Sequence, residues 1–136
     1  MRGARLLVAF ASVALCVGLL SAEALAGKKK PTTVTFFAGA QKVNGAGKVT
    51  TKGSLKTASA CKPARGMKLF LTDAAGVVQA TLAGTTTDES GNWILRGQLP
   101  NTVPATAPVY VKVKATKRTV GKFVCKAGFS AVIQLR

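Results

Sequence analysis

The sequence predicts an all-β protein, a seven- to eight-stranded antiparallel β-sandwich preceded by a helical signal peptide. Two observations lead to this prediction. After residue 26 the chain consists of short segments in which apolar and polar residues alternate, separated by glycine, proline, asparagine and aspartate. The same part of the chain has no helical periodicity, so we expect the only helix to lie in the N-terminal segment.

Residues 1–26 have the organisation of a secretory signal peptide. A start with two arginines precedes an uncharged 15-residue apolar run, and Ala24-Leu25-Ala26 is a small-x-small cleavage site. A transmembrane helix would need about 20 apolar residues, and lipidation of Cys16 is disfavoured because a leucine precedes it. We therefore expect cleavage after Ala26, or after Ala24. The mature protein is then secreted or periplasmic and keeps no transmembrane anchor.

The mature chain divides into a short tail and one domain. Residues 27–31 are basic and have nothing apolar to bury, so we expect a flexible tail. Residues 32–136 suffice for a single β-sandwich with a genuine core. The predicted strands are residues 33–38, 48–55, 67–72, 77–82, 93–96, 109–114, 123–125 and 130–135, with turns at 73–76 and 88–92 and loops at 39–47 and 100–108.

Alternation along these strands assigns the side chains to faces. In the strand 48–55, Val49 and Leu55 share one side, while Lys48 and Lys52 share the other. The same pattern places apolar residues inward elsewhere, namely Val34, Phe36, Met67, Leu69, Leu71, Trp93, Leu95 and the valines of 109–113. It places Lys68, Phe70, Tyr110, Lys112 and Lys114 outward. The lysines therefore indicate solvated sheet faces.

The cysteine count indicates a disulfide. Cys16 leaves with the signal peptide, so Cys61 and Cys125 remain as an even pair in an exported chain, where thiols oxidise. Closing a loop of this length contributes about 4 kcal/mol when the stabilisation is treated as loss of chain entropy. A zinc site is disfavoured because two cysteines without histidine give an incomplete ligand set.

The charge balance is the most unusual property of the sequence. Removing Arg2, Arg5 and Glu23 from the 20 basic and four acidic residues leaves 18 and three, a net charge of +15. Such a field favours anionic partners and accelerates their association. Envelope polymers, lipid head groups and nucleic acid are the candidates. Alternatively, the charge only keeps an exported β-protein soluble and its strand edges unpaired.

The sequence disfavours enzymatic chemistry. It contains no histidine, which excludes imidazole-based triads and histidine-ligated metal centres. Its mature carboxylates are Asp73, Asp88 and Glu89, and the last two are neighbours in one predicted turn, so they cannot face each other across a glycoside. Asp88 begins a calcium-like string, but the residue twelve positions along is Leu99, so an Asx-type turn is favoured. We expect no cofactor and no metal.

One segment resembles a known family. The residues from Thr87 to Leu95 resemble the T-D-x-x-G-x-aromatic-x-apolar turn and strand of carboxypeptidase regulatory-like, or prealbumin-like, modules. Gly53, the strand 66–71 and the strand 109–113 are similar to further elements of that family. The resemblance implies a β-sandwich used as a scaffolding, spacer or adhesion module, of the kind found in small exported bacterial proteins with one disulfide. An immunoglobulin-like label describes much the same sandwich.

The prediction for function is an exported, non-enzymatic β-sandwich module that associates with an anionic envelope surface or polymer. The predicted anion-binding residues are Lys28, Lys29, Lys30, Lys48, Lys52, Lys68, Lys112 and Lys114. The alternative is a protein-binding module, such as an inhibitor or a subunit of a surface assembly, that makes contact through the loop 100–108. Nucleic acid is disfavoured. Trp93 and Phe36 fall on core faces, and although Phe70 and Tyr110 lie on outer faces among lysines, where they could stack on bases, covering a second sheet face or an interface is the favoured interpretation.

Overall fold

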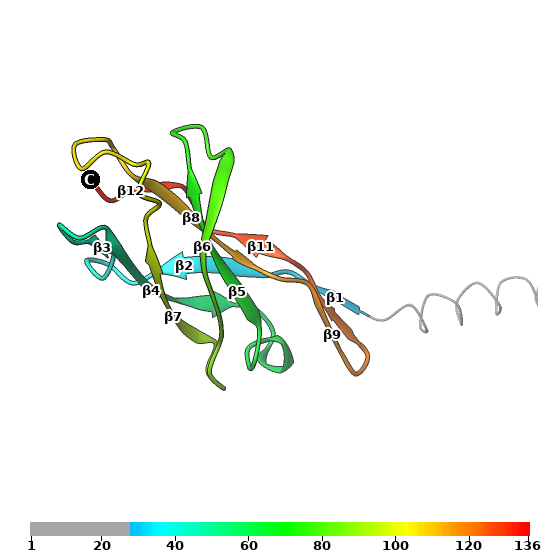
Figure 1. The fold of residues 1–136 in the computed structure, drawn as a ribbon. Helices are drawn as coiled ribbons and strands as arrows, with labels where there is room; N and C mark the ends of the chain where they lie inside the picture. The colour runs from blue at the N-terminus through cyan, green and yellow to red at the C-terminus, as the bar shows by residue number, and fades with distance from the viewer. Residues whose placement is uncertain (1–27) are drawn as a thin grey trace, which may run out of the picture.

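The computed structural model describes residues 28–136 and contains an all-β sandwich, as the sequence predicts. The predicted signal peptide lies outside the described residues. Two sheets pack against each other, and a third, smaller sheet projects from one end of the sandwich, at the right in Figure 1. The C-terminus lies at the other end.

The described chain forms twelve strands and one 3-10 turn, six of the strands being only two or three residues long. In chain order they are β1 (Lys28–Lys30), β2 (Thr33–Phe36), β3 (Lys42–Val43), β4 (Lys48–Lys56), η1 (Ser59–Cys61), β5 (Gly66–Thr72), β6 (Val78–Thr86), β7 (Asn92–Gln98), β8 (Tyr110–Ala115), β9 (Arg118–Val120), β10 (Phe123–Cys125), β11 (Gly128–Phe129) and β12 (Ile133–Gln134).

The sandwich consists of a four-stranded and a five-stranded sheet, both antiparallel. In the four-stranded sheet, β4 pairs with β7 on one side and with β2 and β3 on the other. The five-stranded sheet has the order β11-β8-β5-β6, and β12 also pairs with β8. On one flank of the sandwich β7 lies against β6, so closely that a Cβ on Gly97 would be 2.8 Å from the Leu82 carbonyl oxygen.

Each sheet has one edge strand that is broken in the middle and bridged by a side chain. Between β2 and β3, the Gln41 amide pairs with the backbone N–H and carbonyl of Lys52, at 2.8 and 3.1 Å. Between β11 and β12, Ser130 accepts from the Val113 N–H through its Oγ and donates its own backbone N–H to Val113 O, both at 2.8 Å. The two sheets therefore hold nine strands: β3 lies in the predicted loop 39–47, β11 lies just before the predicted strand 130–135, and the predicted strand 123–125 belongs to the third sheet.

The predicted inward faces form the core between the sheets. Thirteen buried apolar side chains make one cluster: Val34, Val49, Leu55, Met67, Leu69, Leu71, Trp93, Leu95, Leu99, Val109, Val111, Val113 and Ala115. Trp93 is the largest of them, and Phe36 meets it edge-on at 5.7 Å between ring centroids. Gly53 lies opposite Trp93 and must be glycine, since a Cβ there would be 2.5 Å from the indole and 2.0 Å from the Thr35 carbonyl oxygen.

Three turns share one local pattern, an Asn or Asp followed three residues later by a glycine at positive φ. Asp73, Asp88 and Asn44 each accept, through the side-chain oxygen, hydrogen bonds of 2.8–3.0 Å from the backbone N–H groups two and four residues on. The glycines have φ between 79° and 86°, which glycine adopts without strain. The predicted Asx-type turn at Asp88 is confirmed, and its side-chain oxygen is used by the turn itself.

Candidate anion-binding surfaces

The prediction of a flexible tail at residues 27–31 is wrong for Lys28–Lys30. These residues form β1, which pairs in parallel with β10, and β9 completes a three-stranded sheet that we call the arm. Backbone hydrogen bonds from Lys28 N to Lys122 O and from Lys126 N to Lys30 O, both 2.9 Å, fix the pairing. Three lysines with nothing apolar of their own are ordered because a partner far along the chain supplies the hydrogen bonds. The parallel pair also departs from the predicted antiparallel fold.

The predicted disulfide between Cys61 and Cys125 is present, with the two Cα atoms 5.6 Å apart. Cys61 ends η1 and Cys125 ends β10, so the bond joins the arm to the connection between β4 and β5. Both cysteines are fully buried. The disulfide therefore fastens the arm to the sandwich and does not cross the main core.

A buried arginine lies beside the disulfide. Arg65 is fully buried, and its guanidinium donates hydrogen bonds of 2.8–3.3 Å to the Thr32 hydroxyl and to the backbone oxygens of Cys61, Thr116 and Lys126. Burial and the nearby charge of Arg118 lower the pKa of Arg65, because both disfavour the charged form. With its donors directed to backbone oxygens, Arg65 ties together the segments where the arm meets the sandwich. It is not placed to bind an external anion.

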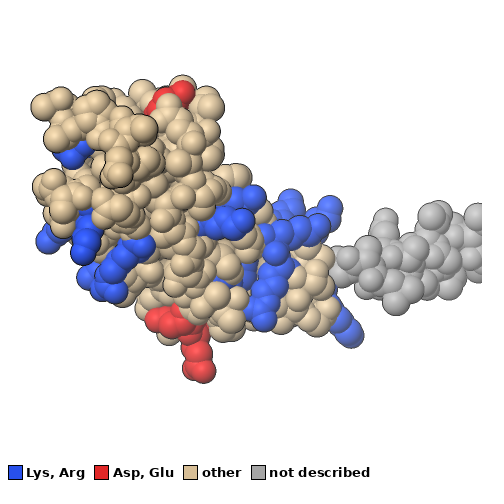
Figure 2. All heavy atoms as spheres, viewed as in Figure 1, with Lys and Arg blue, Asp and Glu red and all other residues tan. Residues whose placement is uncertain are grey.

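The arm is strongly basic. Lys28, Lys29 and Lys30 lie on β1, and the same region carries Lys117, Arg118, Lys122 and Lys126. The Lys30 ammonium lies 5.0 Å from the centroid of the Phe123 ring. Figure 2 shows basic side chains gathered around this end of the molecule. The arm thus presents an ordered group of cations where the sequence predicted a mobile one.

The outer face of the four-stranded sheet holds a second group. Lys48 and Lys52 point outward from β4, as predicted, and cross-strand register adds Lys42 and Arg96 around Thr50. Beside them, between β7 and β6, lies a hollow of about 440 Å³ whose lining includes Lys48, Arg96 and Leu82. Lys42 was missed because it falls in a segment predicted to be a loop.

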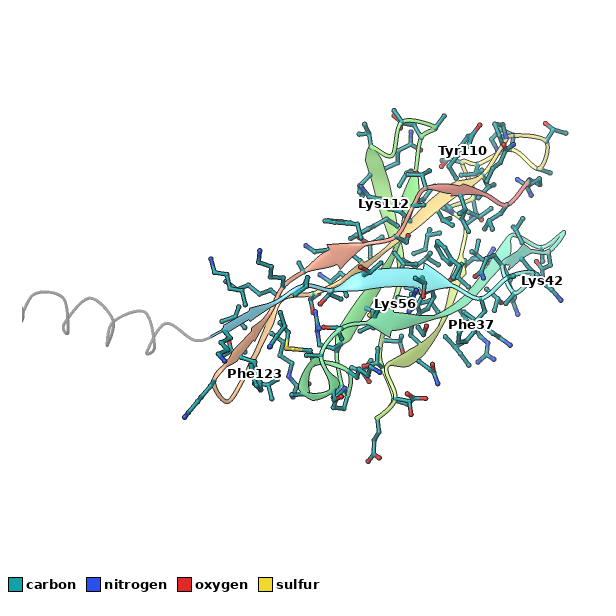
Figure 3. The ribbon with its side chains drawn as sticks, turned by 180° about the vertical axis from the view of Figure 1, so that it is seen from behind. Phe37, Lys42, Lys56, Tyr110, Lys112 and Phe123 are labelled. Atoms are coloured by element: carbon teal, nitrogen blue, oxygen red, sulfur yellow. A yellow bond between two sulfur atoms is a disulfide. The ribbon has the colours of Figure 1, made fainter. Side chains whose placement is uncertain are left out.

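The outer face of the five-stranded sheet holds the third group. Lys68 on β5 is the register partner of Lys114 on β8, and Lys112 is the partner of Phe70. Figure 3 shows Tyr110 and Lys112 following each other along β8. The eight predicted lysines therefore form three separate surfaces, on the arm and on the two outer faces, and do not converge on one site.

The acidic residues of the described chain are confined to two turns. Asp73 lies in the turn between β5 and β6, and Asp88 and Glu89 lie in the turn between β6 and β7. Figure 2 shows them at two separate protruding tips. The two aspartates stabilise these turns through Oδ1. Because the acidic residues lie in the turns, the charged residues on the described sheet faces and arm are basic.

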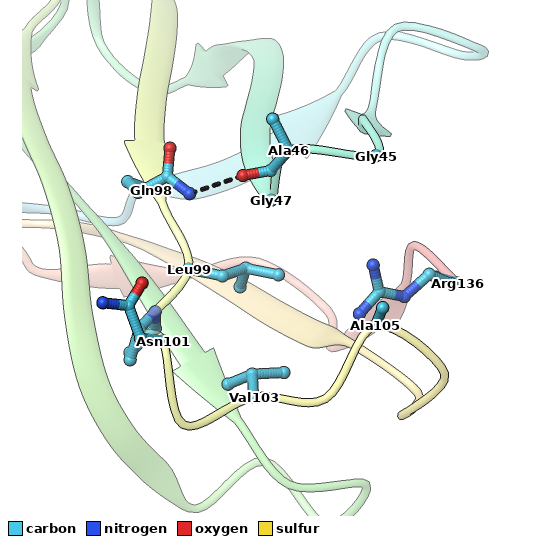
Figure 4. Close-up of a pocket in the computed structure, with 10 residues that line it drawn as sticks. Gly45, Ala46, Gly47, Gln98, Leu99, Asn101, Val103, Ala105 and Arg136 are labelled. Carbon is cyan, nitrogen blue, oxygen red and sulfur yellow. Dashed lines mark hydrogen bonds between the residues drawn. The ribbon is translucent and has the colours of Figure 1, made fainter.

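The loop 100–108 is irregular, as predicted, and borders a hollow. Val103 N bonds to Pro100 O and Ala107 N to Pro104 O, so the segment consists of two successive turns. The Arg136 guanidinium donates to Pro104 O and Ala107 O at 3.0 and 3.2 Å and holds the loop. Between this loop and the turn at Gly45–Gly47 lies a hollow of about 180 Å³, shown in Figure 4.

The chain matches no protein-family model, and no curated protein matches it. Within residues 28–136 no helix is long and apolar enough to span a membrane, and no three cysteine or acidic side chains of this part come together as metal ligands would. The resemblance to carboxypeptidase regulatory-like modules therefore stays a prediction.

Proposed function

We propose that this protein is an exported, non-enzymatic binding module that associates with an anionic surface or polymer of the cell envelope. We further propose that it is related to the carboxypeptidase regulatory-like modules. The segment from Thr87 to Leu95, which supports that relation, forms an Asx-type turn followed by a strand with Trp93 and Leu95 buried. In this proposal the β-sandwich is a rigid scaffold, and the basic residues on its surface make the contact with the anionic partner.

The observation that carries the proposal is the separation of charges. The basic residues are spread over the arm and both outer sheet faces, while all three acidic residues of residues 28–136 lie in two turns. A protein that only needed to stay soluble would be served by mixed charges of both signs. A surface of one sign attracts polyanions from a distance and raises their rate of association.

Retention on a sulfated-polymer column tests the proposal. We expect elution well above physiological salt, with affinity falling steeply as salt rises, because each engaged cation releases counterions from the polymer. Elution at or below physiological salt would contradict the proposal. So would equal retention on the same resin without sulfate groups.

Changing charges on the arm gives a sharper test. Replacing Lys28, Lys29 and Lys30 by Gln keeps the backbone pairing of β1 but removes three cations. The slope of log affinity against log salt should fall by roughly 0.7–0.9 for each of these lysines that contacts the polymer. Replacing the same three residues by Arg is the matched control and should leave the slope unchanged. An unchanged slope in the Gln variant would exclude these three lysines from the contact.

The second candidate is a protein-binding module. It is favoured by the loop 100–108, which is held by Arg136 and borders the 180 Å³ hollow with Val103 in its lining. Such a module would form a complex of fixed stoichiometry that survives high salt. Pull-down from the native envelope at about 0.5 M salt distinguishes the two functions. At that ionic strength charges are screened over much less than the roughly 10 Å that applies at 0.1 M, so a complex that survives is not held mainly by charge.

A further inference from the structure

The outer face of the five-stranded sheet differs from the other basic surfaces in its aromatic residues. We call this surface the aromatic–lysine face; it consists of Lys68, Phe70, Tyr110, Lys112, Lys114 and Phe129. The inference rests on the proposed function, which is association with an anionic polymer. It concerns which kind of anionic polymer this face binds. Phe129 was not among the sequence-predicted residues, because it lies in the two-residue strand β11.

Strand register fixes the arrangement of the face. Phe129, Lys114 and Lys68 form one row across β11, β8 and β5, and the pair of Lys112 and Phe70 forms the next. Tyr110 lies two residues further along β8. Neighbouring strands are about 4.8 Å apart and alternate residues about 7 Å apart. Aromatic rings and cations are therefore interleaved at intervals of about 5 to 7 Å.

Phe129, on the edge strand β11, is the most exposed aromatic residue of this face. Its side chain is 53% exposed, although burying an aromatic side chain is favourable. The ammonium groups of Lys112 and Lys114 lie 5.0 and 5.5 Å from its ring centroid, and Lys112 is further held by a 2.8 Å hydrogen bond to Gly76 O. The ring and its cations are thus preorganised, which reduces the ordering cost of binding.

The short distance between the Phe129 ring and the lysine ammonium groups favours a ligand whose own ring and negative charge are equally close together. In an acidic sugar the carboxylate is bonded directly to the ring, so stacking the ring on Phe129 brings the charge next to the neighbouring ammonium groups. In a nucleic acid the sugar separates each base from its phosphate, so a base stacked here would carry its charge farther away. We propose that the aromatic–lysine face binds an acidic polysaccharide, with sugar rings against Phe129 and Tyr110 and carboxylates beside Lys68 and Lys114.

Binding of the purified, oxidised protein to three probes tests this proposal. Polygalacturonate carries a carboxylate on each ring, polyacrylate carries carboxylates without rings, and oligo-dT carries bases and phosphates. Titration calorimetry near physiological salt should show the tightest binding to polygalacturonate when the probes are compared at equal charge concentration. Phe129→Ala should weaken binding to polygalacturonate about tenfold, as expected for one lost stacking contact, and leave binding to polyacrylate unchanged.

Matched variants on the opposite sheet are the controls. Phe37 is a similarly exposed aromatic, at 45%, next to β2 of the four-stranded sheet, and Phe37→Ala should leave polygalacturonate binding unchanged. Lys68→Gln removes an exposed lysine of the aromatic–lysine face and should cause a several-fold loss, whereas Lys56→Gln, which removes an exposed lysine of β4 that belongs to none of the three basic groups, should not. Unchanged melting temperatures establish that each variant folds.

The outcomes separate this inference from the proposed function. If polygalacturonate and polyacrylate bind equally and Phe129→Ala has no effect, the inference is wrong while the general association with polyanions stands. If none of the probes binds near physiological salt, both are wrong. If oligo-dT binds most tightly and Phe129→Ala weakens it, the face is a nucleic-acid site and the inference is overturned.

Discussion

The sandwich and the arm are stabilised in different ways. The sandwich encloses thirteen buried apolar side chains, so its stability comes from packing spread over many contacts. In the arm strands β1, β9 and β10, the one fully buried residue is Cys125, and the arm is held by the disulfide, by Arg65 and by backbone pairing. The comparison teaches that the two regions can be weakened separately, one by altering packing and the other by removing particular bonds.

The largest effect is expected from the core. Trp93→Ala should lower the free energy of unfolding by about 3–5 kcal/mol, because it empties the centre of the sandwich. Denaturant unfolding measures the change. Ile94 is the matched control, since it is the next residue of β7 but is 46% exposed, and Ile94→Ala should change stability by less than about 0.5 kcal/mol. Equal effects would show that the two sides of β7 are not distinguished by burial.

The next effect is expected from the disulfide. Replacing both Cys61 and Cys125 by Ser should lower the free energy of unfolding by about 2–4 kcal/mol. In addition, amide hydrogen exchange should accelerate most in β1, β9 and β10, since the bond fastens the arm. Exchange that accelerates equally in β4 and β5 would contradict the separation of arm and sandwich.

A smaller effect is expected from the buried arginine. Arg65→Met should cost about 2 kcal/mol, because the backbone oxygens of Cys61, Thr116 and Lys126 lose a charged donor. Arg118 is the control, as its guanidinium reaches Pro63 O and Ala64 O at the exposed surface. Arg118→Met should therefore cost less than half as much. If both variants kept the disulfide and were equally stable, the hydrogen bonds of Arg65 would not be what stabilises this region.

The smallest effect is expected at the turns, which belong to the sandwich. Asp88→Ala should cost about 1 kcal/mol, because two backbone N–H groups lose their acceptor. Asp88→Asn keeps the oxygen and should cost less, as Asn44 shows that an amide forms the same turn.

Calcium should leave the melting temperature unchanged. A melting temperature that rises with calcium would restore the calcium-loop interpretation.

The sequence predicted the sandwich well because alternation and turn residues are local signals. Val49 to Leu55 and the turn at Asp88 could be assigned from a few neighbouring residues. The arm could not, since Lys28 pairs with Phe123 across most of the chain and a three-lysine segment has no pattern of its own. The burial of Arg65 could not be predicted either, because only the fold brings three backbone oxygens to its guanidinium.

The candidate surface was predicted in part. Lys68, Lys112 and Lys114 were assigned outward by alternation, and so were Phe70 and Tyr110. Phe129 was not, because a two-residue strand is too short to show a period, and its position depends on pairing with Lys114. The sequence could predict which residues face outward on long strands but not which short strand completes the surface.

The broken edges of the two sheets have a consequence for how copies of the protein meet. An uninterrupted edge strand is a template for pairing with another chain and so for aggregation. On the β2–β3 edge the longest continuous run is the four residues of β2, and on the β11–β12 edge each run has two. By using Gln41 and Ser130 to bridge the gaps, the chain completes its own sheets, and at these two edges it offers a neighbour too short a strand for stable intermolecular pairing.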